Sequence, residues 1–140
     1  IIFEYYGLRG AKVMGPKPQL TRVFVNLLTN AVQALEARIQ DGGDIEKEQF
    51  RGRVVLSLRN SSKDGFYDIV VEDNGPGIKD ENRARLFTPN FTTKSSGTGL
   101  GLAICKNIIE RCGGEIFYSR SFSLKGACFT VRYPKPPTSA

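Results

Sequence analysis

Apolar residues recur at two spacings along the chain, and the change of spacing predicts where helices and strands lie. Within residues 20–35 they return every three or four positions, the period of one helical face; the members of this stripe are Leu20, Val23, Phe24, Leu27, Leu28, Ala31 and Leu35. The turn at residues 15–18 precedes this helix, and residues 41–43 are expected to end it. A second long helix is predicted from about Leu100 to Cys112, with Gly113-Gly114 as its stop.

Alternating and β-branched apolar residues predict five strands, two pairs of which form hairpins. The predicted strands are residues 1–6, 53–59, 66–72, 115–120 and 127–133. Asp80 is expected to cap a short helix that runs through Phe87. Runs of strands with helices between them predict an α+β fold, a two-layer α/β sandwich whose mixed sheet has helices on one face.

Length and composition indicate one globular domain. The 140 residues, 40% hydrophobic and 24% charged, suit a domain at residues 1–134 with a disordered, proline-rich tail at residues 135–140. Every apolar run is shorter than the roughly 18 residues that cross a bilayer. The first residue is Ile1 rather than Met and no signal peptide pattern is visible, which suggests a segment of a larger protein.

Net charge, the number of cysteines and the lack of histidine limit the kinds of ligand and site that the chain can have. The net charge of +6 suits a polyanion such as a nucleotide or a nucleic acid, but Lys and Arg are scattered and not interleaved with aromatic residues, which disfavours a nucleic-acid-binding domain. Three cysteines without a C-x-x-C pair predict neither disulfides nor zinc, but reduced thiols in a cytoplasmic domain. The chain has no histidine, which excludes a phosphorylated histidine within it.

Two asparagines on the first predicted helix form a candidate metal site. Asn26 and Asn30 are four residues apart, so they lie one above the other at the edge of the apolar stripe. An amide oxygen is a neutral, hard ligand for Mg²⁺, whose phosphate ligands would supply the negative charge. A pair of ordinary surface asparagines explains this pattern equally well.

The sequence Asp-Asn-Gly-Pro-Gly-Ile at residues 73–78 follows a predicted strand directly. The carboxylate of Asp73 only accepts hydrogen bonds, so it matches the exocyclic amine of adenine and would reject the carbonyl of guanine. Gly75 and Gly77 would let the backbone approach a flat base closely. An ordinary turn is the alternative, and the motif by itself favours that alternative.

Two more stretches are candidates for phosphate binding. Gly97-Thr98-Gly99-Leu100-Gly101 precedes and opens the second long helix, where backbone N–H groups can hold a phosphate. Its spacing differs from the dinucleotide pattern G-x-G-x-x-G, and no Gly-Lys-Ser/Thr triplet occurs. Between the motifs, Phe87 and Phe91 can anchor a mobile loop whose Lys94 would reach a terminal phosphate; a plain loop with two core aromatic residues is the alternative.

Taken in order, these motifs resemble those of the GHKL ATPase superfamily and, within it, the sensor histidine kinases. Residues 26–31 resemble the N box, residues 73–77 and 97–101 the two glycine boxes, and residues 87–91 the F box. The resemblance covers nearly the whole chain and implies the Bergerat-type ATP-binding fold. A short lid at about residues 78–96 and the Phe-Thr-Thr-Lys stretch resemble the nitrogen-regulation-like subgroup.

The resemblance implies a role for each motif residue. Asp73 would hold adenine, Asn30 would bind Mg²⁺ with Asn26 assisting, and the second glycine box would wrap the phosphates. The residues implied to bind ATP and Mg²⁺ are Asn26, Asn30, Asp73, Gly75, Gly77, Ile78, Lys94, Gly97, Thr98, Gly99, Leu100 and Gly101. Two positions depart from the family pattern. Gln33 replaces a common Lys, so Lys94 is expected to supply the positive charge, and Ala127 replaces a Thr near adenine.

The residue at position 26 favours transfer to histidine over hydrolysis. Relatives that hydrolyse ATP place a Glu there as general base, and an amide cannot take a proton. A histidine acceptor already carries a free lone pair at neutral pH. With Asn26 and Lys94 as catalytic residues, we expect transfer of the γ-phosphate to a histidine on a separate dimerisation domain.

The same resemblance implies further partners. A response regulator receiver domain would be an indirect partner, and no contact with nucleic acid or membrane is expected of this domain. The expected location is cytoplasmic, and anchoring of the parent protein in the bacterial inner membrane stays open. The alternatives are another GHKL ATPase or serine kinase, and a nucleotide-binding module without catalysis.

Overall fold

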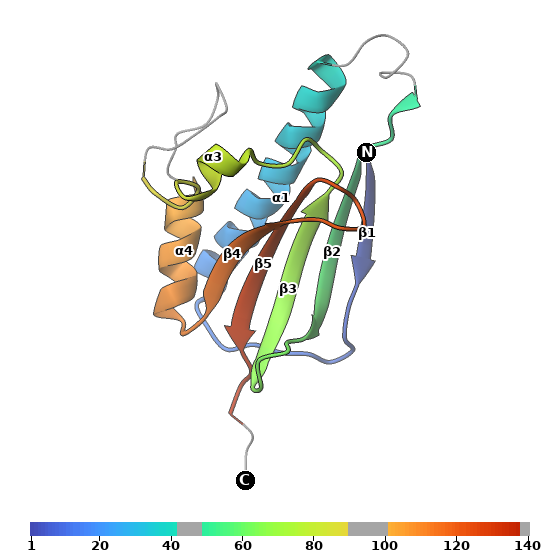
Figure 1. The fold of residues 1–140 in the computed structure, drawn as a ribbon. Helices are drawn as coiled ribbons and strands as arrows, with labels where there is room; N and C mark the ends of the chain where they lie inside the picture. The colour runs from blue at the N-terminus through green and yellow to red at the C-terminus, as the bar shows by residue number, and fades with distance from the viewer. Residues whose placement is uncertain (42–48, 90–100, 138–140) are drawn as a thin grey trace.

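The computed structural model describes residues 1–41, 49–89 and 101–137, which form a five-stranded sheet with helices on one face (Figure 1). The strands are β1 (Ile2–Tyr6), β2 (Arg53–Asn60), β3 (Phe66–Asp73), β4 (Glu115–Arg120) and β5 (Ala127–Pro134). Their order in the sheet is β1-β2-β3-β5-β4. The edge strand β1 runs parallel to β2, and the other neighbours are antiparallel. The predicted mixed sheet and α+β class are confirmed.

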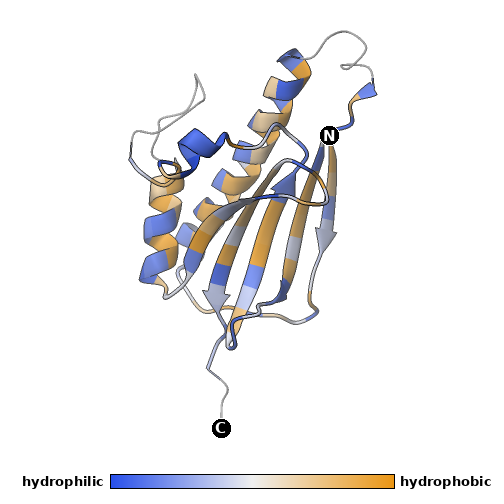
Figure 2. Cartoon of the chain, in the orientation of Figure 1, coloured by the Kyte–Doolittle hydropathy of each residue, from blue (hydrophilic) through white to orange (hydrophobic). Residues whose placement is uncertain are grey.

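The helical layer consists of α1 (Lys17–Asp41), the short α3 (Asp80–Arg83) and α4 (Gly101–Arg111). The buried residues of α1 are Leu20, Val23, Leu27, Ala31 and Leu35, all members of the predicted stripe. Together with Cys105 and Ile109 of α4 they pack against Val71 and Val131 of the central strands. Figure 2 shows these apolar stripes on the two long helices and on the central strands. Burial of this stripe fixes which face of α1 meets the sheet.

The end of α4 has the predicted glycine stop. The N–H of Gly114 donates to the carbonyl of Ile109 at 2.9 Å, and that of Gly113 donates to Glu110 at 3.0 Å. Gly113 has a φ of +83°, the left-handed conformation that this cap requires. A Cβ on Gly114 would come within 2.5 Å of the carbonyl oxygen of Arg132, so α4 ends against β5.

The prediction for the short helix was wrong in two respects. Asp80 is the first helical residue and not the cap; Lys79 precedes the helix without a capping side-chain hydrogen bond, and Asp80 pairs with Arg83 at 3.2 Å. The helix also ends at Arg83, before Phe87. After Arg83 the backbone N–H groups donate to carbonyls three residues back, from Arg85 to Asn82 at 3.1 Å and from Leu86 to Arg83 at 3.4 Å, so the segment continues as turns and not as an α-helix. Residue Leu100 of the second predicted helix lies outside the described residues. No helix in the described ranges is long and apolar enough to cross a membrane.

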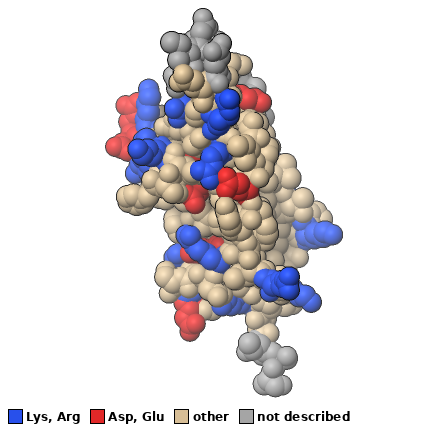
Figure 3. Space-filling view, turned by 90° about the vertical axis from the view of Figure 1, so that its right-hand side faces the viewer, with Lys and Arg blue, Asp and Glu red and all other residues tan. Residues whose placement is uncertain are grey.

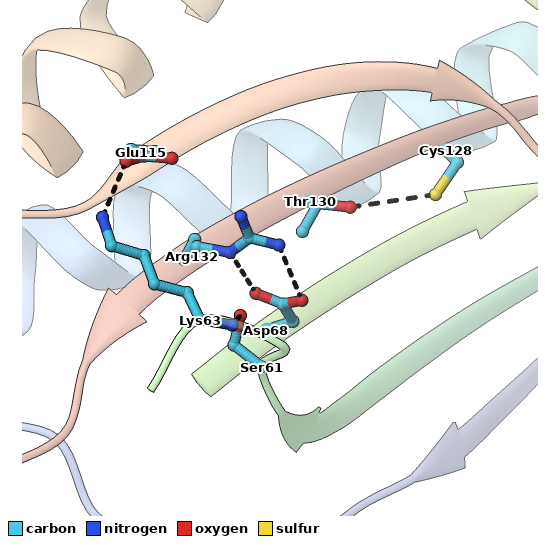
Figure 4. A network of polar contacts seen from close by, with 7 residues as sticks. All are labelled: Ser61, Lys63, Asp68, Glu115, Cys128, Thr130 and Arg132. Atoms are coloured by element: carbon cyan, nitrogen blue, oxygen red, sulfur yellow. Dashed lines mark hydrogen bonds and ion pairs between the residues drawn. The ribbon is translucent and has the colours of Figure 1, made fainter. Parts of the chain in front are cut away.

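The opposite face of the sheet carries a network of polar contacts (Figure 4). Arg132 of β5 lies directly across from Asp68 of β3, and its guanidinium donates to both carboxylate oxygens, at 2.9 and 3.2 Å. The side chains of this pair are only 20% and 8% exposed, respectively. Burial works against the charge on Asp68, but hydrogen bonds from Arg132 and Ser61 outweigh it and lower the pKa of that carboxyl group.

Basic side chains do not form a continuous band on the face shown in Figure 3, which lies on the β1 side of the sheet. Lys and Arg residues there are separated by uncharged and acidic residues. A nucleic-acid-binding surface needs a basic stripe, so this face does not have the arrangement expected of one.

The lowered pKa of Asp68 generates a prediction about stability. A depressed folded-state pKa contributes stability above the unfolded value of 3.8, and this contribution is lost as the pH falls through the folded value. We expect Arg132→Met to lower the free energy of unfolding by about 2 kcal/mol at neutral pH. The loss should shrink at an acidic pH below the lowered pKa of Asp68, because the protonated carboxyl group no longer attracts a guanidinium. Urea unfolding at both pH values measures the difference.

The matched control is Lys63→Met, which breaks the exposed Lys63–Glu115 pair on the same face, whose charged groups lie 3.1 Å apart. Exposed pairs contribute little, so a change under about 1 kcal/mol is expected. Equal losses for Arg132→Met at both pH values would contradict the assigned role of Asp68.

Candidate functional site

Of the predicted site residues that the structure describes, one group lies at the end of β3 and the start of α4, and the two asparagines lie on α1. Figure 1 shows the end of β3, the helix α3 and the start of α4 at the same end of the sheet, with α1 running behind the sheet. Asp73 is the last residue of β3, and Gly101 is the first residue of α4. Asn26 and Asn30 lie in the middle of α1 and are both partly buried.

The side chain of Asp73 is buried, with the residue 4% exposed, and is held by the backbone around it. One carboxylate oxygen, Oδ1, accepts hydrogen bonds from the N–H of Gly75 at 2.9 Å and of Ala127 at 3.3 Å. The backbone of Gly126 also lies against it, because a Cβ there would overlap the carbonyl of Asp73 and lie 2.7 Å from Oδ1. Two segments, the turn after β3 and the start of β5, therefore fix the orientation of this carboxylate.

The turn after β3 is attached to its neighbours through Asn74. Its Oδ1 accepts from the N–H of Arg53 at 2.7 Å, and its Nδ2 donates to the carbonyl of Arg51 at 2.8 Å. Arg38 of α1 donates to the backbone carbonyl of Asn74 at 2.9 Å. The sequence suggested only a turn residue here, because the partners of Asn74 are more than 20 residues away along the chain.

The two glycines of this turn meet different requirements. Gly77 has a φ of +74°, which side chains rarely adopt. Gly75 is buried, and a Cβ on it would lie 3.0 Å from Oδ1 of Asp73 and 3.4 Å from Cβ of Ala34 in α1. The N–H of Ile78 then donates to the hydroxyl of Tyr118 at 2.9 Å. The sequence around Tyr118 gives no sign of this role, because nothing local marks a contact across 40 residues.

Asn26 lies where α1 meets the start of α4. Its Nδ2 donates to Sγ of Cys105 at 3.7 Å, and that thiol donates to the carbonyl of Val23 at 3.8 Å. Burial raises the pKa of the Cys105 thiol. A Cβ on Gly101 would still be 3.9 Å from Nδ2 of Asn26. Nδ2 of Asn26 is hydrogen-bonded within the protein, so the side-chain oxygen is the atom that can bind a cation.

Phe87 packs on the core, which fits both the predicted anchor of a loop and the alternative of a core aromatic residue. Its ring packs edge-on against Phe129 of β5, with the ring centroids 6.2 Å apart. The predictions for Phe91, Lys94, Gly97, Thr98, Gly99 and Leu100 fall outside the described residues and stay predictions.

Comparison with known proteins agrees with the motifs. The family model described as "Histidine kinase-, DNA gyrase B-, and HSP90-like ATPase" matches residues 15–137. The chain is 37% identical over 123 residues to the sensor histidine kinase ZraS of Salmonella typhi, which covers 88% of this chain and 23% of that protein. It is 38% identical over 126 residues to the C4-dicarboxylate transport sensor protein DctB of Rhizobium meliloti, with 90% of this chain and 18% of that protein covered. The chain thus spans less than a quarter of either relative.

The solved structures agree with this assignment. The mycobacterial sensor histidine kinase MprB superimposes with a TM-score of 0.75 at 26% identity, over 97% of this chain and 84% of that one. The catalytic domain of the histidine kinase ThkA gives a TM-score of 0.75 at 28% identity, over 96% and 80% of the two chains. The family predicted from the motifs is confirmed, whereas the nitrogen-regulation-like subgroup stays a prediction.

The contact between Gly126 and Asp73 generates a prediction. Because backbone atoms would clash with the new methyl group, we expect Gly126→Ala to lower the free energy of unfolding by about 1–3 kcal/mol. Gly101→Ala is the control: the nearest atom of the described residues, Nδ2 of Asn26, would lie 3.9 Å from the new Cβ, and alanine in a helix is neutral or stabilises it by up to about 1 kcal/mol. Thermal and urea unfolding compare the two variants. If Gly126→Ala is as stable as the wild type, that result would contradict the close approach of Gly126 to Asp73.

Proposed function

The chain belongs to the histidine kinase-, DNA gyrase B- and HSP90-like ATPase family and is an ATP-binding catalytic domain of the sensor histidine kinase type, and from this premise we propose that it positions Mg-ATP for transfer of the γ-phosphate to a histidine of a separate dimerisation domain. The observation that carries the proposal is the fixed carboxylate of Asp73, next to a glycine turn and facing the helix that carries Asn26 and Asn30. The acceptor must lie on another domain, because this chain has no histidine.

Asp73 is proposed to recognise the base. A carboxylate whose orientation is fixed by the backbone can accept a hydrogen bond from the exocyclic amine of adenine, and it has no proton to offer a guanine carbonyl. Gly75 and Gly77 keep side chains out of the space beside it, and Ile78 would form an apolar wall for the ring. The N–H of Ala127 donates a hydrogen bond to Asp73. The methyl side chain of Ala127 cannot provide the hydroxyl contact that a Thr at this position would.

The phosphates and the cation are proposed to lie between α1 and the start of α4. Asn30, with Asn26 assisting, would offer amide oxygens to Mg²⁺, which supports phosphoryl transfer by neutralising phosphate charge. The hydrogen bond from Nδ2 of Asn26 to Cys105 fits this role, because it leaves the oxygen as the donor atom for the metal. Gly101 begins α4, whose N-terminus favours an anion; the neighbouring Gly97, Thr98, Gly99 and Leu100 and the charge of Lys94 are proposed to complete the phosphate site.

The partners are proposals as well. The full-length relative ShkA was solved in complex with AMPPNP, and ThkA was solved in complex with the response regulator protein TrrA. By analogy, the partners proposed here are ATP, the histidine-bearing dimerisation domain and, indirectly, a response regulator. The cytoplasmic location stays a prediction.

The role of Asp73 is tested by nucleotide binding. We expect the chain to bind ATP but not GTP, and Asp73→Asn to weaken ATP binding roughly ten- to hundredfold, the value of a hydrogen bond to a charged group. Asparagine keeps Oδ1, so the bonds from Gly75 and Ala127 can persist and the fold should survive. Calorimetric titration with each nucleotide measures affinity, and thermal unfolding verifies folding.

Asp64→Asn is the matched control, because Asp64 lies exposed on the turn between β2 and β3. It should bind ATP like the wild type. An Asp73→Asn variant that is folded and binds ATP as tightly as the wild type would rule out the proposed role of this carboxylate.

The absence of a general base at position 26 predicts slow hydrolysis. Phosphate release from Mg-ATP should stay close to the protein-free rate, and Asn26→Ala should not lower it further, because an amide cannot activate water. A coupled phosphate assay under nucleotide-saturated conditions measures this. Rapid hydrolysis by the wild type would contradict the inference drawn from the amide at position 26.

A further inference from the structure

Tyr118 links three parts of the molecule around the proposed base pocket. It lies on the edge strand β4 and packs against the core on the helical face of the sheet. Its ring lies against Phe129 of β5, with centroids 5.4 Å apart, and the guanidinium of Arg83 in α3 lies 5.1 Å from the centre of the same ring. Its hydroxyl accepts the hydrogen bond from the N–H of Ile78.

The hydroxyl of Tyr118 holds one end of the turn that follows β3. At the other end, Oδ1 of Asp73 binds the N–H groups of Gly75 and Ala127. Gly77 lies between these attachments in its left-handed conformation, and a Cβ there would come within 3.4 Å of the Tyr118 hydroxyl oxygen. The turn is therefore held at both ends by hydrogen bonds. The Tyr118 hydroxyl lies close to Gly77, the residue that allows the turn to bend.

We propose that Tyr118 is a positioning residue for the adenine base, which acts by fixing the backbone of Ile78 beside Asp73. This inference rests on the proposed function, because Ile78 and Asp73 are the residues assigned to the base there. A turn that is already ordered in the free protein loses less conformational freedom when the ligand binds, so a pinned turn gives tighter binding. The link also joins the pocket to α3, which begins two residues after Ile78.

The substitution Tyr118→Phe removes only the hydroxyl and keeps the ring against Phe129 and Arg83. We expect the affinities for ATP, ADP and adenosine to fall by the same factor, about twofold to tenfold, because one neutral hydrogen bond is lost at the base end. The Mg²⁺ dependence of ATP binding should not change. Calorimetric titrations with the three ligands measure these factors, and thermal unfolding verifies that the variant is folded.

Tyr67→Phe is the matched control, because Tyr67 lies near the start of β3, at the end of the strand opposite Asp73. It should bind all three ligands like the wild type. Amide hydrogen exchange gives a direct readout: the N–H of Ile78 should exchange faster in Tyr118→Phe than in the wild type or in Tyr67→Phe.

Gly77→Ala disturbs the same turn from the other side. If both residues act through that turn, the double variant should lose less affinity than the product of the two single losses. If the loss of affinity in the double variant equals the product of the two single losses, the hydroxyl and the turn act separately, which overturns the inference.

The remaining outcomes are distinguishable. Wild-type affinity in a folded Tyr118→Phe would overturn the inference and leave the proposed function intact. A loss for ATP with unchanged adenosine binding would place the effect at the phosphates and also overturn it. If the wild type binds none of the three ligands, the proposed function fails, and the role of Tyr118 fails with it.

Discussion

The carboxylate of Asp73 is buried where β3 ends, and a buried carboxylate is stable only when donors satisfy it. The donors come from Gly75 and from Ala127, so the turn after β3 and the start of β5 must both reach the same oxygen. This requirement explains the lack of a side chain at Gly126, whose backbone lies against Asp73. The geometry proposed to recognise a base is thus also the geometry that joins two central strands.

Helix α1 serves the core and the site with one sequence pattern. Its buried stripe faces the sheet, and Asn26 lies beside that stripe, where a side chain can contact α4 and still be partly exposed. Cys105 offers a weakly polar partner to Asn26 in the core, and this contact orients the amide. Helical periodicity therefore determines both where the helix packs and which way its amides point.

Local patterns were sufficient for much of the fold and less so for the site. The stripe of α1, the two hairpins and the glycine stop of α4 were predictable because each depends on neighbouring residues. The end of α3 was not, because the chain after Arg83 continues in hydrogen-bonded turns that the local pattern does not distinguish from a helix. Asp73 and Asn26 were predicted from their motifs, whereas the contacts of Asn74 and Tyr118 depend on partners distant in the sequence. The roles of Lys94 and of residues 97–100 stay predictions from the resemblance.

The parallel pairing of β1 has a consequence for how the sheet assembles. β2 with β3 and β4 with β5 are hairpins that can form from neighbouring segments, whereas the pairing of Ile2 with Arg53 closes a loop of about fifty residues that contains α1. Contacts between distant segments form slowly, because the entropy of loop closure must be overcome first. The hydrogen bond from Ala127 to Asp73 joins the two hairpins across 54 residues, so the proposed base pocket depends on a loop closure about as long as the one that docks the edge strand.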